Sequence, residues 1–419
     1  MKKLFRFIIG QVLAIKAKQY LKKNHTQVIA ITGSIGKTST KEAIYTVLKD
    51  RFNVYRSEKS FNTPIGLSLA VLQEKESGFS SIKAWFGILR RTFFGEKTVY
   101  KKMILEMGAD TPGDIKKLIK IAPSAISVVT NIAPVHLAEG QFKDIYEIAE
   151  EKGSLIKNLS PDKLAILNYD DPLITAMETR AQKFTYGTGP NALLKATEVH
   201  ATSKHLIFNV TYGVQKERFT IPVLGKFQIY VFLPAIAVGL KMGMSLQECA
   251  EALSKFSLPP GRMNPIDGKN KSIIIDGSYN ASPATMEKAL ELLMELKSDR
   301  KIAALGTMNE LGDISKEAHL KLGKQAFKVV DMLITIGPEA NTIKEGAMNA
   351  GMSEDDIFTF LDSEEAGHFL LDKLEPKDLV LVKGSQNRVR MEKFVKVVMA
   401  KPEEAPELLC RQGEAWQSI

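Results

Sequence analysis

The sequence contains little cysteine, and its cysteines form no pattern. Only Cys249 and Cys410 occur among 419 residues, far apart and outside any Cys-x-x-Cys or Cys/His arrangement. The sequence therefore predicts neither a disulfide framework nor a structural zinc site, and it favours the reducing cytoplasm.

The sequence also lacks an apolar run long enough to cross a bilayer. Residues 4–10 are mostly apolar, but lysines follow at 16, 18, 22 and 23, and no small-residue cleavage site is evident. Neither a secretory signal nor a membrane-spanning helix is predicted. Residues 1–26 are expected to form a basic, amphipathic helix that packs either on the protein or on a membrane surface. Its expected apolar side holds Phe5, Ile8, Val12, Ile15 and Gln19.

The composition is that of a globular chain with two or three domains, because 44% of the residues are apolar and 25% are charged. The net charge of +9 suits an anionic partner, which the charge alone does not identify. Nucleic acid is not an expected partner, since the sequence has no basic and aromatic module that binds it.

Short apolar stretches alternate with helical patterns along most of the chain, which predicts an α/β fold with mostly parallel sheets. The expected strands are 27–31, 103–105, 125–129, 164–167, 273–275, 302–305, 332–336, 357–360 and 379–382. Residues 205–222 alternate around Gly213 as in an antiparallel hairpin, and Ser245 with Glu248 forms a capping box that opens a helix. Pro259-Pro260-Gly261 is expected to be a hinge between domains.

A glycine-containing loop at residues 32–40 follows the first predicted strand and precedes a helix. Its sequence is Thr32-Gly33-Ser34-Ile35-Gly36-Lys37-Thr38-Ser39-Thr40. The glycines allow consecutive N–H groups to face phosphate oxygens, and the helix adds its N-terminal dipole. Lys37 would reach the terminal phosphates, and the Thr38 hydroxyl would bind Mg²⁺. Ile31 replaces the first glycine of the common phosphate loop, but the position between strand and helix still predicts nucleotide binding.

This shorter loop and a series of later motifs resemble the Mur ligase family, in order over about residues 27–400. The later motifs are Asn62–Gly66, Leu105–Ala109 with Gly113–Ile115, Thr130–Ile132 with His136–Leu137, Asn168–Asp171, Asp276–Pro283, Leu305–Gly312 with His319, Lys383–Ser385 and Met391–Glu392. The segments 276–283 and 305–312 resemble the branch of the family that adds D-alanyl-D-alanine.

The resemblance implies a domain order and a reaction. A central P-loop ATP-binding domain is expected at 27–260 and a Rossmann-like α/β domain at 261–401, followed by a polar, frayed tail at 402–419. The expected activity is an ADP-forming amide ligase that activates the carboxylate of a peptidoglycan precursor peptide as an acyl phosphate and joins it to D-alanyl-D-alanine. Such an enzyme serves cell-wall biogenesis, cell shape and division. It uses ATP and one or two Mg²⁺ ions, and a monomer is expected.

The resemblance also implies roles for individual residues. The expected catalytic residues are Lys37, His136, Lys152 and Arg262, and the expected metal ligands are Thr38, Glu106 and His136. ATP would contact Gly33, Ser34, Ile35, Gly36, Lys37, Thr38, Ser39, Asn168, Asp276, Tyr279 and Asn280, and the other substrates would contact Asn62, Glu310, Lys383 and Ser385. For His136 the alternative is a hydrogen-bonded, partly buried histidine, and for residues 276–280 it is an ordinary strand-end turn.

Lys152 resembles the lysine that many family members carry as a carbamate, an anion that binds Mg²⁺ where an ammonium does not. The alternative is a solvated helix lysine beside Glu150 and Glu151. The acidic residue that the family has two positions later is Ser154 here.

Two departures from the family pattern affect the expectations. Phe227, Gln228 and Val231 replace the polar residues of a G-x-H-N-x-x-N segment, so ATP would be held differently or nucleotide selectivity would be relaxed. In addition, this branch carries a UDP-binding domain before the loop, whereas about one helix precedes Gln27. Residues 79–100 look inserted and mix aromatic with basic side chains. We hypothesise that this segment and the N-terminal helix lie together on the inner face of the membrane, near a lipid-linked precursor. The alternative is that both cover the central sheet.

Two other functions stay open. One is a ligase for another amine or for another, lipid-linked acyl acceptor, as in polyglutamate or folate-type synthesis. The other is a catalytically idle nucleotide-binding scaffold, which the altered segment at 225–231 favours. The presence of Lys37, Thr38, Glu106 and His136 argues against the scaffold.

Overall fold

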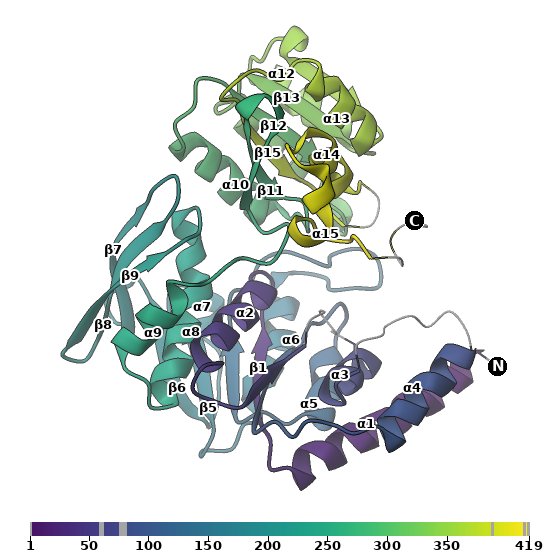
Figure 1. Cartoon of the computed structure of the whole chain (residues 1–419), viewed down its shortest axis with the longest axis vertical. Helices are drawn as coiled ribbons and strands as arrows, with labels where there is room; N and C mark the ends of the chain where they lie inside the picture. The colour runs from purple at the N-terminus through teal and green to yellow at the C-terminus, as the bar shows by residue number, and fades with distance from the viewer. Residues whose placement is uncertain (1, 58–62, 75–81, 387–388, 414–415, 417–419) are drawn as a thin grey trace.

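A computed structural model of the chain describes residues 2–57, 63–74, 82–386, 389–413 and 416. The described chain forms two sheets, each covered by helices on both faces, one below the other in Figure 1. The α/β class with a mostly parallel first sheet is confirmed. The change from one sheet to the other falls near Pro259-Pro260-Gly261, since β9 ends at Ile221 and β10 begins at Asn264.

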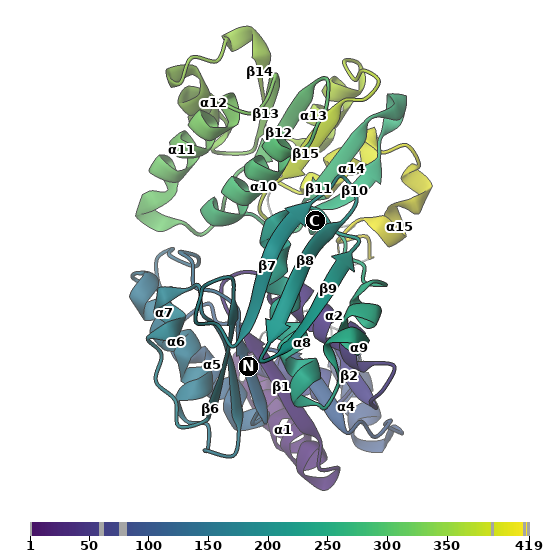
Figure 2. The ribbon, with the colours of Figure 1, turned by 90° about the vertical axis from the view of Figure 1, so that its left-hand side faces the viewer.

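The first sheet has nine strands in the order β2-β3-β1-β4-β5-β6-β7-β8-β9. The strands are β1 Gln27–Thr32, β2 Val54–Arg56, β3 Lys102–Glu106, β4 Ile126–Val129, β5 Leu164–Asn168, β6 Gln182–Gly187, β7 Leu194–Ala201, β8 Leu206–Tyr212 and β9 Gln215–Ile221. Neighbours from β2 through β7 are parallel, and β7, β8 and β9 are antiparallel. Figure 2 shows this antiparallel extension reaching toward the second domain.

Helices bury both faces of the first sheet. One core cluster joins it to α2 Lys37–Leu48, α8 Ile229–Lys241 and α9 Leu246–Leu253. The other joins it to α1 Lys2–Lys23, α3 Pro64–Val71, α4 Ile82–Phe94, α5 Asp114–Ile121, α6 Ile145–Lys157 and α7 Pro172–Thr175. Ile29 and Ile31 of β1 enter the first cluster, whereas Val28 and Ala30 enter the second. This two-residue alternation places apolar side chains on both faces, as a buried parallel strand requires.

The second sheet has six strands in the order β10-β11-β15-β12-β13-β14, of which only β10 is antiparallel to its neighbour. The strands are β10 Asn264–Asp267, β11 Ile273–Gly277, β12 Lys301–Gly306, β13 Met332–Ile336, β14 Ile357–Phe360 and β15 Leu379–Lys383. One face carries α10 Pro283–Glu295, α11 Ser315–Phe327 and α12 Ala340–Asn349. The other carries α13 Ser363–Leu371, α14 Met391–Val398 and α15 Ala405–Leu408. Short 3₁₀ turns lie at Lys226–Gln228, Lys269–Lys271, Gly312–Ile314, Glu354–Asp356 and Pro402–Glu404.

Each expected strand is present, as are the hairpin of β8 and β9 and the capping box of Ser245 and Glu248. Four strands were not predicted, namely β2, β6, β7 and β10. They are short or carry polar residues, and β10 contains Pro265. Proline suits an edge strand, the position that β10 occupies, so local sequence argues against a strand there.

The apolar side predicted for the N-terminal helix is not the side that packs on the protein. The buried residues of α1 are Ile9, Leu13, Ala17 and Leu21, which pack into the second core cluster. Ile8 and Ile15 are more than half exposed, and the side chain of Phe5 lies outside the described residues. The observed stripe is apolar at every fourth position, whereas the predicted one ends in Gln19. The side of α1 that packs on the protein is the side whose apolar residues continue over the whole length of the helix.

Residues 82–94 of the apparent insertion form α4, and residues 79–81 lie outside the described part. Trp85 and Ile88 enter the same core cluster as α1, so one face of each helix covers the central domain, as the alternative stated. Among the residues that the structure describes, no helix combines the length and the apolar character that crossing a membrane requires.

The expectation of a frayed tail is wrong for residues 402–413. Ala405 and Leu409 are buried in the cluster beneath α13 and α14. The Leu409 N–H also donates to the Ala405 carbonyl at 2.9 Å. The acidic residues around them suggested a solvated segment, but only the positions facing the sheet need to be apolar.

Leu409→Ala should lower the free energy of unfolding by about 2–5 kcal/mol, because it removes a buried side chain and leaves a cavity. The neighbouring Leu408 is partly exposed, so Leu408→Ala should change stability by less than about 0.5 kcal/mol. Urea unfolding followed by circular dichroism measures both. Equal effects of the two changes would contradict the packing described for the tail.

Candidate active site

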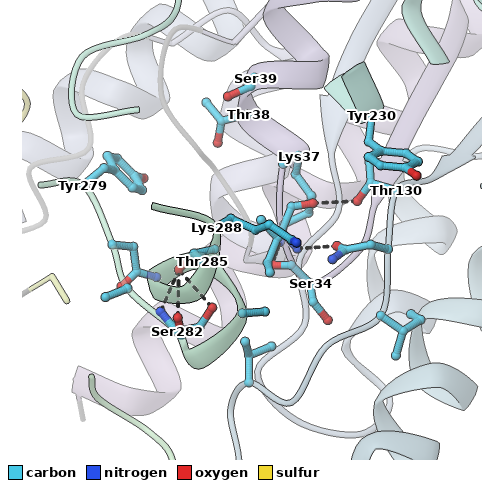
Figure 3. A pocket seen from close by; sticks show the side chains of 18 of the residues that line it. Ser34, Lys37, Thr38, Ser39, Thr130, Tyr230, Tyr279, Ser282, Thr285 and Lys288 are labelled. Carbon is cyan, nitrogen blue, oxygen red and sulfur yellow. Dashed lines mark hydrogen bonds between the residues drawn. The ribbon is translucent and has the colours of Figure 1, made fainter. Parts of the chain in front are cut away.

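Apart from Gly33, the residues predicted to bind phosphate and metal line one cleft of about 830 Å³ between the two domains. Its walls are loops that follow the C-terminal ends of β1, β3, β4 and β5 in the first sheet and of β11, β12 and β15 in the second. Open α/β sheets bind their ligands at this edge. Figure 3 shows the loop with Lys37 and Thr38 on one side of the cleft and Tyr279, Ser282 and Thr285 on the other.

The backbone of the phosphate loop requires its glycines. Gly33 has φ 140° and Gly36 has φ 84°, values that residues with a side chain rarely adopt. A Cβ atom on Gly33 would also lie 2.0 Å from Thr130 Oγ1. The helix α2 begins at Lys37 without a side-chain cap. The positive end of the helix dipole lies at this loop, where it would attract an anion.

The Lys37 ammonium lies folded into this loop. Its Nζ donates to the carbonyl oxygens of Gly33 at 2.7 Å and Ser34 at 3.3 Å, and burial lowers its pKa. A phosphate oxygen would be a stronger partner for this cation than a neutral carbonyl, because charge-assisted hydrogen bonds are the stronger ones. The lysine is thus placed to exchange one partner for the other.

Thr130 and Asn131 hold the loop in shape. Asn131 Oδ1 accepts from the Ile35 N–H at 2.8 Å, and Thr130 Oγ1 donates to the Ile35 carbonyl at 2.7 Å. Ser34 Oγ donates to the Ala133 carbonyl at 3.0 Å and accepts from the Ala133 N–H at 2.9 Å. This supporting role was not predicted, although the Thr130-Asn131 pair belonged to a motif already noted.

The two predicted magnesium ligands of the loop region lie together. Thr38 Oγ1 is 3.3 Å from Glu106 Oε2 at the end of β3. Mg²⁺ binds through one or two carboxylates together with water and substrate phosphates, so a hydroxyl and a carboxylate beside the phosphate loop fit this ion. Glu106 Oε1 accepts no aligned hydrogen bond, although the Lys41 ammonium lies 3.2 Å away.

Lys41 is a further component of this arrangement that sequence reasoning missed. Its side chain is fully buried, and its Nζ donates to the Ser57 carbonyl at 2.6 Å while pairing with Glu106. It lies one turn after Lys37 on α2, and nothing in its position in the sequence distinguishes it from a solvated lysine.

Arg262 reaches the same point from the second domain. Its Nη2 donates to Thr38 Oγ1 at 3.1 Å, and its guanidinium lies 3.8 Å from the ring centre of Tyr279. The predicted catalytic arginine and the predicted metal ligand are thus in direct contact across the domain boundary. The aromatic ring holds the guanidinium in place by a cation–π interaction.

His136 bridges the domains in a similar way. Its Nδ1 lies 2.6 Å from Glu310 Oε2, and this contact lowers the pKa of Glu310. Its Nε2 lies 3.6 Å from Asp110 Oδ1. The Leu137 N–H donates to the Glu310 carbonyl at 2.9 Å. The structure therefore brings a predicted metal ligand together with a predicted substrate residue, and it adds Asp110, which sequence reasoning missed although it follows the acidic end of β3.

Lys152 is not the solvated helix residue that the alternative described. Only 1% of it is exposed. Burial, and then the nearby charge of Lys37, lower its pKa to about 7. Within the described part of the chain its Nζ has no hydrogen-bond or ion-pair partner. The adjacent Glu151 is also buried, since its carboxylate accepts from the N–H groups of Gly113 at 2.7 Å and Ile115 at 2.6 Å. Glu151 thereby fixes α6 against the start of α5.

Asn168 lies on the cleft wall with its amide already engaged. Its Nδ2 donates to the Thr130 carbonyl at 3.0 Å, and its Oδ1 accepts from the Asp170 N–H at 3.1 Å. Tyr230, which was not predicted, donates its hydroxyl to Asp170 at 2.8 Å, and burial raises its pKa to about 12. Figure 3 shows its ring beside the phosphate loop.

The three residues that depart from the family pattern line this same part of the cleft. Gln228 Nε2 lies 3.5 Å from the Arg262 carbonyl, so its amide is directed toward the hinge. Phe227, Tyr230 and Val231 present aromatic and apolar surface. Aromatic surface of this kind would stack against any base, and the hydroxyl of Tyr230 is already engaged with Asp170.

Asp276 does not line the cleft. It is fully buried, its Oδ1 accepts from the Ser278 N–H at 2.9 Å, and burial raises its pKa. Its carboxylate shapes the turn after β11, which matches the strand-end alternative. Tyr279 and Asn280, which follow, do line the cleft.

Lys383 and Ser385 lie on the cleft wall, but their polar atoms hold this turn. Lys383 Nζ donates to the Asn280 carbonyl at 2.8 Å, and burial lowers its pKa to about 7. Ser385 Oγ donates to the Ala281 carbonyl at 3.2 Å. Asn62, also predicted to contact substrate, lies outside the described residues.

The C-terminal tail supports the same turn. Arg411 Nη1 donates to the Ser278 carbonyl at 3.2 Å and to Glu392 at 3.1 Å, and Arg411 Nη2 donates to the Tyr279 carbonyl. Glu392 is buried between Arg411 and Arg390. Sequence reasoning missed Arg411 because it treated this segment as frayed.

Known proteins match both domains. The family model "Mur ligase middle domain" matches residues 31–239, and the model "Mur ligase, glutamate ligase domain" matches residues 261–386. The UDP-N-acetylmuramoyl-tripeptide--D-alanyl-D-alanine ligase of Bacillus subtilis (strain 168) is 30% identical over 388 residues, covering 92% of this chain and 79% of the relative.

Solved structures agree with this match. MurF ligase from Thermotoga maritima, determined in complex with ADP, has a TM-score of 0.76 and 26% identity over 93% of this chain and 83% of its own. MurF from Acinetobacter baumannii has a TM-score of 0.79 and 24% identity over 94% of this chain and 81% of its own, which shows the shared fold.

The aromatic wall predicts weak discrimination between nucleobases. The affinities for ATP and GTP should differ by less than about tenfold, which is about 1.4 kcal/mol. Phe227→Ala should weaken both by a similar factor, because stacking on an aromatic ring is insensitive to the base. Displacement of a fluorescent nucleotide measures these affinities. A preference for ATP of more than about 100-fold would contradict the account of this wall.

Proposed function

Since this chain belongs to the Mur ligase family, we propose that it is an ADP-forming ligase that joins a peptidoglycan precursor peptide to D-alanyl-D-alanine. The relative from Bacillus subtilis carries this activity in its name and is 30% identical along most of both chains. The branch-like segments at 276–283 and 305–312 lie at or beside the cleft, which supports the same branch.

The observation that carries the proposal is the meeting of Lys37, Thr38 and Glu106 from one domain with Arg262 from the other. Phosphoryl transfer requires positioning and neutralisation of charge rather than covalent help from the protein. A loop of N–H groups, two cations and a pair of magnesium ligands at one point supply both. An idle scaffold would have no need to keep this set together.

The proposed reaction has two steps. A carboxylate oxygen of the peptide attacks the γ-phosphorus of ATP, and ADP leaves with the bonding electrons. The amine nitrogen of the dipeptide then attacks the acyl phosphate carbon, loses a proton, and phosphate leaves. The amide bond therefore forms at the expense of one phosphoanhydride bond, and no water enters.

The residues of the chain have separate roles in these steps. Lys37 would leave the Gly33 carbonyl for the terminal phosphate, and Arg262 would neutralise the charge that develops on it. Thr38 and Glu106 would hold one Mg²⁺, which supplies further neutralisation of the phosphates. His136, with Asp110 beside its Nε2, would hold a second Mg²⁺.

Lys152 is proposed to act as a carbamate. A carbamate forms when a neutral amine attacks CO₂, and a pKa of about 7 leaves about half of the Lys152 side chains neutral at neutral pH. The product is an anion, which would remove the buried positive charge that now lies beside Lys37 and would suit a nearby cation.

The acyl and amine substrates are proposed to lie on the Glu310 side of the cleft. Asn62, Glu310, Lys383 and Ser385 remain the proposed contacts, with Lys383 and Ser385 acting through the turn that they hold. We propose that the ligase works in the cytoplasm as a monomer, in peripheral contact with the inner face of the membrane.

The direct test is phosphate release from ATP and Mg²⁺, with product masses, in the presence of D-alanyl-D-alanine and UDP-N-acetylmuramoyl-tripeptide. Release should need both substrates and should yield the joined product. Lys37→Ala should lower kcat by about 10²–10³, the usual loss when one preorganised charge is removed, whereas Lys49→Ala, an exposed position after α2, should have no effect. ATP binding without any joining would favour the scaffold, and joining with another acceptor would reassign the substrate.

The carbamate has its own signature. With ¹³C-bicarbonate, the wild type should show a carbamate resonance that grows as pH rises through about 7 and is lost below it, because only the neutral amine reacts. Lys152→Gln should lack the resonance and most activity, whereas Lys157→Gln, exposed on the same helix, should keep both. Full activity of Lys152→Gln would contradict this role.

A further inference from the structure

The helices α1 and α4 expose large apolar side chains on the faces that they turn away from the core. On α1 these are Phe7, Ile8 and Ile15, with exposed fractions of 62%, 52% and 56%. On α4 they are Phe86, Phe93 and Phe94, at 74%, 41% and 85%. Single exposed apolar residues are ordinary, but a group of this size in one place marks an interaction site. These six residues are called the α1–α4 surface below.

The two helices form one surface because they lie side by side. Figure 1 shows them together at the end of the first domain farthest from the second. The Lys16 ammonium of α1 lies 4.6 Å from the ring centre of Phe93 on α4. The Tyr20 hydroxyl donates to the Thr98 carbonyl at 2.7 Å, which fixes the chain that leaves α4 against α1.

The spacing of the exposed residues places apolar and basic side chains on the same helix faces. On α4, Phe86, Arg90 and Phe93 follow one another at intervals of four and three residues, opposite the buried Trp85 and Ile88. Basic side chains at the edge of an apolar strip can reach polar headgroups while their stems stay on apolar surface. This is the pattern of a helix that lies in a membrane interface.

On α1, the exposed side is apolar in the first part of the helix and basic in the last part. Ile8 and Ile15 occupy its first part, and Lys18 and Lys22 continue the same side. The stripe that faces the protein contains no charge. Lys18 and Lys22 therefore continue the exposed side of α1 and lie away from the groups that pack on α3.

The excess of positive charge in the sequence falls in the segments that form these two helices. Together they carry ten Lys and Arg and no Asp or Glu. The whole chain has 57 basic and 48 acidic residues, so the rest has 47 against 48 and is nearly neutral. The net charge of +9 thus comes from the segments that form these two helices, which favours a negatively charged partner over a second copy of the chain.

We propose that the α1–α4 surface binds an anionic lipid bilayer, with both helices lying in the interface and the phenylalanine and isoleucine side chains entering the apolar layer. Exposed phenylalanines bordered by lysine and arginine match the two layers of such a membrane, apolar inside and negative outside. The catalytic cleft lies elsewhere on the molecule, so the proposal does not rest on the ligase activity.

The test is flotation of the full chain with vesicles of phosphatidylcholine alone or mixed with phosphatidylglycerol. Binding should occur only with the mixed vesicles and should weaken as salt rises, because screening reduces the charge attraction. The double variant Phe86→Ser, Phe94→Ser should lower the affinity more than about tenfold. Lys18→Glu with Lys22→Glu should lower it by at least a similar factor.

A matched control is Leu361→Ser, which removes a side chain that is 80% exposed on the other domain and should leave vesicle binding unchanged. All the substituted positions are exposed, so circular dichroism should show wild-type folding. Absence of binding to mixed vesicles would overturn the proposal, as would binding that the Phe86 and Phe94 changes leave intact. Concentration-dependent dimers that the same changes abolish would assign the surface to a second copy instead.

Discussion

The hydrogen bond from Arg262 to Thr38 joins the two halves of the site, and the catalytic arrangement depends on it. Thr38 belongs to the phosphate loop and Arg262 to the first segment of the second domain, so neither domain alone holds the complete set of charges. The contact of His136 with Glu310 repeats this dependence at the other end of the cleft. Activation of a carboxylate by ATP therefore requires both domains to face one another. Residues such as Thr130 and Arg411 hold the loops that face one another across the cleft.

Most of the fold could be predicted because buried parallel strands have a clear sequence pattern. The runs at β1, β12 and β15 are short, apolar and partly β-branched, and no other element suits them. The strands β2 and β10 were not predicted because pairing with a neighbouring strand, rather than their own composition, holds them in the sheet. Which side of α1 packs on the protein could not be predicted for the same reason. Two apolar stripes were available, and only the shape of the core decides between Ile8 and Leu13.

The candidate site could be predicted where a motif specifies backbone geometry. The loop from Gly33 to Lys37 is such a case, because its φ angles admit little besides glycine. The burial of Asp276 could not be predicted, since its place in a motif does not say which way the carboxylate turns. Lys41 and Arg411 were missed because only burial reveals that an ordinary lysine or arginine is engaged. Their contacts with Glu106 and the Ser278 carbonyl come from segments distant in the sequence.

The most direct measurement follows the oxygen of the activated carboxylate. The tripeptide substrate would carry ¹⁸O in its reacting carboxylate, and the phosphate released by the complete reaction would be analysed by mass. Transfer through an acyl phosphate predicts one ¹⁸O atom in each phosphate, because the carboxylate oxygen that attacks phosphorus leaves with it. Phosphate without ¹⁸O, formed while the amide product accumulates, would contradict the central claim that this cleft joins carboxylate to amine by phosphoryl transfer.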